Sequence, residues 1–136
     1  MNLTQKTKQH YEKQGAIIGL VERYNSFTHR RNDLFGWIDQ VMVWGGVVYG
    51  VQTCSMSGLA EHRTKILAEP KFKKWVEAGA GAIIMAWEKH GLKGKRKTWR
   101  AREYCYDTLK AEFREVPNEQ DKEFEGNTTE APTYFP

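Results

Sequence analysis

The sequence predicts an α/β protein with a central mixed β-sheet flanked by helices. Short runs rich in β-branched residues alternate along the chain with segments of helical spacing, which is typical of this fold class. A Gly-Gly pair at positions 45–46 separates two of these runs, a pattern that favours an antiparallel hairpin. Residues 82–87, AIIMAW, are continuously apolar, as expected for a buried strand with a parallel neighbour. A sheet with both kinds of pairing is mixed.

The first half of the chain is expected to contain one helix and three strands. Residues 3–14 have amphipathic spacing, and Gly15 is well placed to end that helix. An apolar run over 16–23 predicts a buried strand, and the polar residues 25–32 predict a loop. Strands over 37–44 and 47–53 enclose the Gly-Gly turn.

Helices and the remaining strands are expected in the second half. Apolar residues at helical spacing predict a helix over 59–68, which Pro70 ends, and a shorter helix follows over 72–78. The strand over 82–87 comes next. Residues 98–106 alternate enough to predict a last strand, while a helix over 100–113 is a competing interpretation.

Length and composition favour a single folded domain with a polar tail. The chain has 136 residues, of which 40% are hydrophobic and 28% charged, and this composition excludes disorder of the whole chain. Residues 1–116 are assigned to the domain. Residues 117–136, rich in Asn, Glu, Thr and Pro, are expected to form a disordered tail. No apolar run is long enough to span a membrane, no secretory segment precedes the domain, and two cysteines make no disulfide framework, so a cytoplasmic protein is expected.

Positive charge is concentrated in the body of the chain. Residues 117–136 contain five acids and one lysine, so the residues before them carry a net charge of +8, which favours a polyanionic partner. Residues 89–102 contain seven Lys and Arg and no acid, and we expect this segment to bind phosphates. Its Trp99 is either a platform for an unpaired base or, as we favour, part of the core. The residues expected to contact nucleic acid are Arg30, Arg31, Arg63, Lys93, Lys95, Arg96, Lys97 and Arg100.

Two polar residues are expected to face each other across the hairpin. Asp39 lies six residues before the Gly-Gly turn and Gln52 six residues after it. Because side chains alternate along a strand, Gln52 and Cys54 share one face. Asp39 either bonds within a local turn or binds Mg²⁺, which prefers carboxylate and amide oxygens. Glu22 and Asp33 are expected at the same end of the sheet, and such a cluster suits metal-assisted phosphodiester hydrolysis.

The strand with Asp39, the hairpin, the strand with Gln52 and Cys54 and the helix after it resemble the core of the PD-(D/E)XK nuclease superfamily. This superfamily includes restriction endonucleases and Holliday-junction resolvases. The run DLFGWID followed by GVVYGVQTCSMSGLAEHRTKIL is similar to small phage-associated nuclease-like proteins, and the resemblance covers residues 15–102. It implies a restriction-endonuclease-like core and an endonuclease, dependent on Mg²⁺ or Mn²⁺, that hydrolyses DNA, branched or phage DNA included. It also implies a location in the cytoplasm of a bacterial or phage-infected cell, and it leaves open whether the protein forms a homodimer.

The resemblance also implies roles for individual residues. Asp39 corresponds to the metal-binding aspartate and Gln52 to the second acidic ligand, with Glu22 or Asp33 assisting. Cys54 occupies the position of the catalytic lysine, so the following helix is left to supply that charge through Lys65 or Arg63, unless these two belong to a solvated helix face. Cys54 and the amide of Gln52 motivate an alternative, a nuclease-like fold that binds DNA without cleaving it. A third interpretation is an interaction module whose acidic tail covers its own basic face.

The sequence shows neither the spacing of zinc ligands nor a nucleotide-binding motif. The four histidines and two cysteines lack the spacing of zinc ligands. Neither a phosphate-binding P-loop nor a dinucleotide-binding glycine motif is present.

Overall fold

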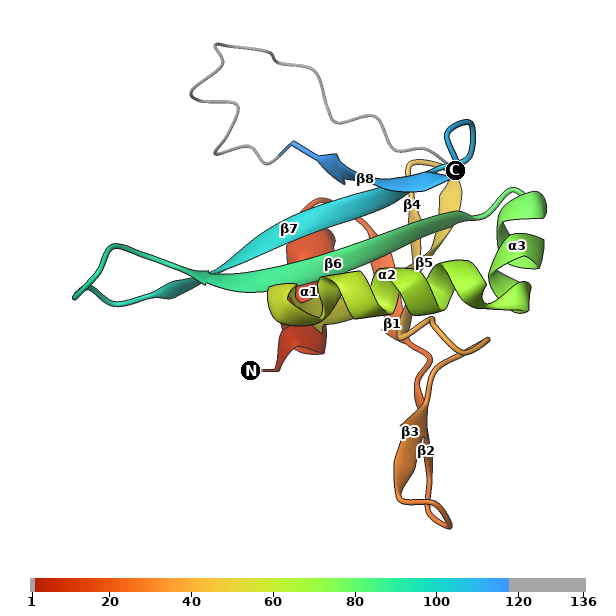
Figure 1. Cartoon of the computed structure of the whole chain (residues 1–136), viewed down its shortest axis with the longest axis horizontal. Helices are drawn as coiled ribbons and strands as arrows, with labels where there is room; N and C mark the ends of the chain where they lie inside the picture. The colour runs from red at the N-terminus through yellow and green to blue at the C-terminus, as the bar shows by residue number, and fades with distance from the viewer. Residues whose placement is uncertain (1, 118–136) are drawn as a thin grey trace.

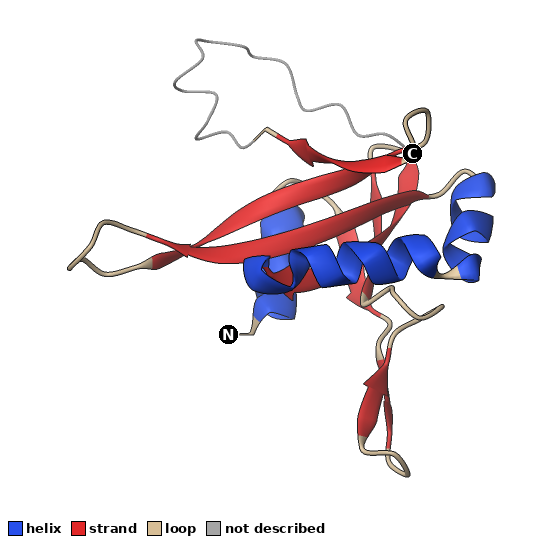
Figure 2. Ribbon diagram, in the orientation of Figure 1, coloured by secondary structure: helices blue, strands red, loops and turns tan. Residues whose placement is uncertain are grey.

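The structure is a computed structural model that describes residues 2–117. Six strands form one sheet in the order β1-β4-β5-β6-β7-β8, and β2 and β3 form a separate two-stranded ribbon. Helices flank the sheet (Figures 1 and 2), so the expected α/β class with a mixed sheet is confirmed. The tail expected over 117–136 lies outside the described residues, apart from Pro117.

The first half of the chain builds one helix and five strands, which are α1 (Leu3–Glu12), β1 (Ile17–Leu20), β2 (Arg23–Asn25), β3 (Arg30–Asn32), β4 (Gln40–Trp44) and β5 (Val47–Ser55). The second half begins with a short 3₁₀ helix, η1 (Met56–Gly58). It continues with α2 (Leu59–Ala68), α3 (Pro70–Glu77), β6 (Gly81–His90), β7 (Thr98–Asp107) and β8 (Glu112–Val116).

Pairing within the sheet is antiparallel except at its centre. β1, β4 and β5 form an antiparallel meander. β6 then lies parallel to β5, after a crossover through α2 and α3, as parallel pairing requires. β7 and β8 extend the sheet in antiparallel fashion. In the described chain, helix α1 is followed by the three antiparallel strands of the meander. The helical crossover then leads to the parallel strand β6, and β7 and β8 form a further antiparallel pair at the far edge.

The two faces of the sheet carry separate cores. Tyr11 of α1 packs with Met42, Tyr49, Ile83 and other residues on one face. On the other face, helices α2 and α3 bury Leu59, Ile66 and Phe72 against a second cluster. Burial of these apolar side chains is the main force that fixes the helices on the sheet.

A close approach of β6 to β5 requires a glycine. A Cβ atom added at Gly81 would lie 2.4 Å from Cδ1 of Tyr49, whose ring is only 2% exposed. Gly19 in the edge strand β1 has no atom within 4 Å of the same position. The glycine is therefore a packing requirement at position 81 and not at position 19.

The structure differs from the sequence predictions at several strands, among them β4, which begins at Gln40 and not at residue 37. The strand expected to be buried over 16–23 is the short edge strand β1, in which Ile17 is 75% exposed. The loop expected over 25–32 is the β2–β3 ribbon, whose polar strands have no apolar alternation to reveal them. β8 was not predicted, because this strand is only five residues long and most of its residues are charged. The strand interpretation of residues 98–106 is confirmed by β7, and the competing helix is wrong.

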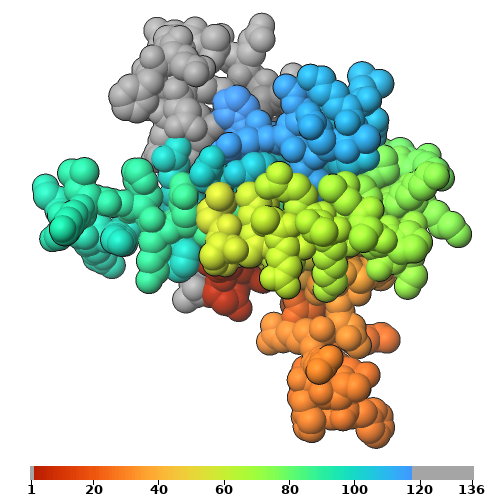
Figure 3. Space-filling model, in the orientation of Figure 1, coloured from red at the N-terminus to blue at the C-terminus, as the bar shows by residue number. Residues whose placement is uncertain are grey.

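Two hairpins project from the body of the molecule. One is the β2–β3 ribbon and the other is the end of the β6–β7 pair, as the cartoon and the space-filling view show (Figures 1 and 3). Within residues 2–117, none of the helices combines the length and the apolar character that crossing a membrane requires.

Candidate functional site

Three carboxylates converge where β1 ends and β4 begins. Glu22 lies two residues after β1, Asp33 follows β3, and Asp39 directly precedes β4. Each offers an oxygen, and these oxygens lie within 4.8 Å of one another. A backbone hydrogen bond from Val21 N to Asp39 O, 2.9 Å long, continues the β1–β4 pairing beyond the strand ends and holds the two segments together. The convergence expected for these acids is therefore present, and we call the three residues the acidic cluster.

Asp39 and Gln52 make the cross-strand contact expected from the symmetry of the hairpin. The register pairs Gln40 with Val51, so the two residues beyond that pair lie opposite each other. Gln52 Nε2 donates to Asp39 Oδ2 at 2.7 Å, and Thr53 N donates to the same oxygen at 2.9 Å. Gln52 Nε2 also donates to the carbonyl oxygen of Thr53 at 3.2 Å. The amide thus presents its N–H groups to the site and supports the Asp39 carboxyl.

The environment of Asp39 favours its protonated form. Burial raises the pKa of Asp39 to about 8, and a hydrogen bond with Asp33 and the charges of Asp33 and Glu22 act in the same direction. The bond from Thr53 N opposes them. Arg31 Nη1 lies 3.2 Å from Glu22 Oε1 and balances part of the negative charge. A buried proton held between carboxyl groups marks a place where a divalent cation can substitute for it.

Cys54, at the position where a catalytic lysine is expected, carries no positive charge. Cys54 is 6% exposed, and burial, together with the charge of Asp39, raises the pKa of its thiol to about 11. The thiol is therefore neutral at physiological pH, which also excludes it as a thiolate nucleophile.

Among the described residues 2–117, no bond joins either proposed substitute on the next helix to the acidic cluster. Lys65 is exposed on α2, and within residues 2–117 no hydrogen bond or ion pair joins it to the cluster. Arg63 is half-buried, and its guanidinium carbon lies 5.8 Å from the centre of the Tyr104 ring. Its cation–π contact with the sheet accounts for its position on the inner side of α2.

Apart from Arg63 on α2, the basic residues predicted to contact nucleic acid lie on the two projecting hairpins. Arg30 and Arg31 belong to β3 and are exposed. Lys93, Lys95, Arg96 and Lys97 are exposed in the β6–β7 connection, and Arg100 follows on β7, half-buried. Not every cation of this segment is available, because Arg102 makes two bonds to the Glu115 carboxylate, 2.8 and 2.9 Å long.

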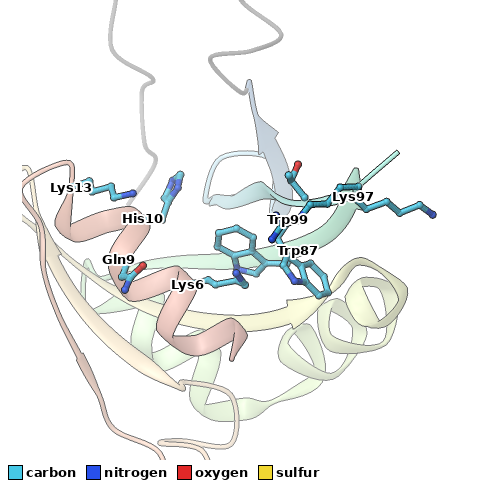
Figure 4. Close-up of a pocket in the computed structure, with 9 residues that line it drawn as sticks. Lys6, Gln9, His10, Lys13, Trp87, Lys97 and Trp99 are labelled. Atoms are coloured by element: carbon cyan, nitrogen blue, oxygen red, sulfur yellow. The ribbon is translucent and has the colours of Figure 1, made fainter. Parts of the chain in front are cut away.

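A second site, whose α1 side the sequence interpretation missed, lies on the face of the sheet that carries α1. Its nine lining residues enclose a cleft of about 580 Å³ and come from α1, β6, β7 and the β6–β7 connection: Lys6, Gln9, His10, Lys13, Trp87, Arg96, Lys97, Thr98 and Trp99. We call it the tryptophan cleft (Figure 4). The favoured assignment of Trp99 to the core is wrong, because its side chain is 38% exposed and lines this cleft. The available signal was the spacing of Lys6, His10 and Lys13, which puts them on one helix face.

Comparison of the chain with protein-family models, with curated proteins and with solved structures finds no match.

Proposed function

We propose that the protein is a metal-dependent deoxyribonuclease whose hydrolytic centre is the acidic cluster. The observation that carries this proposal is the meeting of Glu22, Asp33 and Asp39 within 4.8 Å. The element order supports a restriction-endonuclease-like core, because the cluster lies on a three-stranded antiparallel meander followed by a helical crossover to a parallel strand. The sequence resemblance to PD-(D/E)XK nucleases points to the same arrangement. DNA is the proposed substrate, with branched DNA included.

The residues of the cluster fit a hard divalent cation. Mg²⁺ binds carboxylate oxygens at about 2.0–2.1 Å in octahedral geometry, so ligand oxygens on one ion lie about 3–4 Å apart. Oxygens already within 4.8 Å need only a small closure. Mg²⁺ or Mn²⁺ in this place would polarise a phosphoryl oxygen and acidify a water molecule. Glu22, Asp33 and Asp39 would hold the ion, and Gln52 would orient the Asp39 carboxylate.

The substrate backbone would be held by the basic hairpins. Arg30 and the cations at 93–97 are exposed, and Lys and Arg side chains of this kind bind phosphates without reading bases. Two copies of the centre would allow both strands of a duplex to be cut together, so a homodimer belongs to the proposal. Both cysteines are free thiols, which suits the proposed cytoplasmic location.

A second candidate function is DNA binding without cleavage, and three observations favour it. Cys54 supplies no cation at the expected position. Lys65 is exposed and has no bond to the acidic cluster in the described part of the chain. Gln52 directs its N–H groups, and not its oxygen, to Asp39. In each case a charged group that catalysis would need is missing from the acidic cluster, whereas the basic hairpins that would bind DNA are not affected.

Cleavage assays separate the two candidates. Supercoiled plasmid and a synthetic four-way junction are incubated with the protein in Mg²⁺, in Mn²⁺ and in EDTA. We expect cleavage that requires the metal and that falls at least about tenfold in Asp39→Ala, because a metal ligand contributes several kcal/mol to transition-state stabilisation. Glu61→Gln, an exposed acid on α2, is the matched control. Metal-independent binding with no cleavage by the wild type would select the second candidate, and absence of both would refute both.

A further inference from the structure

The tryptophan cleft is built by a regular pattern on α1. Lys6, Gln9, His10 and Lys13 are spaced so that they share one helix face. The adjacent face carries Thr7 and Tyr11, which are fully buried against the sheet. Figure 4 shows the α1 side chains along one side of the cleft and the β6 and β7 side chains along the other. The cleft therefore lies between α1, which the core fixes on the sheet, and the β6–β7 hairpin.

Aromatic surface is available inside this cleft. Trp87 is 7% exposed, and its indole Nε1 donates to Thr7 Oγ1 at 2.9 Å, so its ring is held in place. Trp99 is 38% exposed. The Lys89 ammonium lies 5.4 Å from the centre of the Trp99 ring, a cation–π contact that positions the second indole. A planar ring with an accessible face can stack on a nucleobase.

The cleft carries positive charge on both of its sides. Lys6 belongs to α1 and Lys13 is its C-terminal cap residue, and Arg96 and Lys97 come from the β6–β7 connection. None of the nine lining residues in this described part of the chain is acidic. Cations on both sides of an aromatic surface match the chemistry of a nucleotide, which has a flat base joined to a phosphate.

We propose that the tryptophan cleft binds an unpaired nucleotide of single-stranded DNA, with the base on Trp99 and the phosphates on Lys6, Lys13 and the cations at 96–97. A volume of about 580 Å³ suits one nucleotide unit. The interior base pairs of a duplex are excluded from this cleft, because their bases are stacked on both sides and have no free face for the indole. The inference rests on the proposed function in taking DNA as the ligand, and it adds a single-stranded segment to the substrate.

The cleft and the acidic cluster are joined through the sheet. Thr53 Oγ1 donates to Thr7 Oγ1 at 2.9 Å, and Trp87 Nε1 donates to the same Thr7 oxygen. Thr53 N in turn donates to Asp39. Register also places Trp87 beside Ser55, two residues beyond Thr53. Both sites therefore lie toward the same end of the sheet on opposite faces, an arrangement that fits a junction between duplex and single strand.

Binding of a short single strand tests this proposal. The probe is a fluorescein-labelled, 5′-phosphorylated oligothymidylate of eight nucleotides, and anisotropy is measured in EDTA at several salt concentrations. We expect Trp99→Ala to weaken binding about 5- to 150-fold, the range for loss of one stacked base, while Trp99→Phe retains most of the affinity. Lys6→Ala should weaken binding and lower the salt slope by about 0.7. Lys8→Ala, an exposed lysine of α1 outside the cleft, should leave both unchanged.

The outcomes separate this inference from the proposed function. If the wild type and Trp99→Ala bind the oligonucleotide equally well, the cleft assignment is overturned, and DNA is held elsewhere. If thymidine 5′-monophosphate competes as tightly as the oligonucleotide, the cleft takes a free nucleotide and the assignment to a strand is overturned. Binding through Trp99 by a protein that cleaves nothing in Mn²⁺ would support the cleft and contradict the nuclease activity. Because binding is measured without metal, damage to the acidic cluster does not affect the result.

Discussion

Replacing Asp39 with Asn should make the metal-free protein more stable at neutral pH. The side chain is 5% exposed and lies beside two other carboxylates. An Asn at this position can still accept from Gln52 Nε2 and Thr53 N, and its own N–H₂ can donate to Asp33. The substitution therefore keeps the hydrogen bonds and removes the charge that burial disfavours.

The size of the effect follows from the pKa of Asp39. Folding raises this pKa from 3.8 to about 8, so between these values the folded state binds a proton that the unfolded state has released. The stability of the wild type therefore falls as pH rises through this window, by about 1.4 kcal/mol per pH unit. At pH 7 the accumulated cost is on the order of 4 kcal/mol if the full shift operates, and Asp39→Asn avoids it.

Denaturant unfolding from pH 4 to pH 8 in EDTA measures this difference. Asp107→Asn is the matched control, because Asp107 is also buried, at 3% exposure, but its pKa is shifted in the opposite direction. Burial acts to raise that pKa, yet bonds from Lys110 N and Arg114 outweigh it and lower the pKa. The ionised Asp107 carboxylate therefore stabilises the fold fully above pH 3.8, and this stabilisation is lost as the pH falls through the lowered pKa of the folded state. At pH 7 the two substitutions should therefore have opposite signs.

If the stability of the wild type does not fall between pH 4 and pH 8, the conclusion that folded Asp39 holds a buried proton is refuted. An Asp39→Asn variant that is less stable than the wild type at pH 7 would refute it too. Either result would mean that the three carboxylates are farther apart or better solvated in solution than in the structure.

Three further predictions address metal, DNA and packing. Saturating Mn²⁺, at about 100 times its dissociation constant, should stabilise the wild type by about 2.7 kcal/mol in thermal unfolding and leave Asp39→Asn unchanged; an equal shift in both would place the ion elsewhere. Alanine at the three basic positions 95–97 should flatten the salt dependence of duplex binding by up to about three units without altering base preference, and an unchanged slope would show that these side chains only face solvent. Gly81→Ala should cost about 1–3 kcal/mol, because its Cβ would overlap the Tyr49 ring, whereas Gly19→Ala should cost less than about 1 kcal/mol in the same chemical denaturation experiment.

The local elements could be predicted from sequence because they depend on neighbouring residues. The spacing of apolar residues and Pro70 delimit the helix over 59–68, which is α2 in the structure. The Gly-Gly pair sets the hairpin turn, and in an antiparallel pair the turn alone determines that Asp39 lies opposite Gln52. The apolar run at 82–87 likewise identifies a strand buried on both faces, which becomes β6.

Burial, charge and recognition depended on contacts between distant residues. Ile17 is as apolar as any core residue, yet it is exposed, whereas Ile18, on the opposite face of the same edge strand, packs in the core beside Tyr11 of α1. Burial is the main cause of the raised pKa of Asp39, and Asp33 and Glu22 add to it once the β2–β3 ribbon has brought the intervening chain back. The tryptophan cleft joins Lys6 to Trp99, which are separated by most of the chain. The sequence by itself determined the helices, the hairpin and its facing polar pair, since these follow from period and turn chemistry. Only the tertiary structure decided the proton on Asp39 and the cleft, because desolvation and cavity shape depend on which elements pack together.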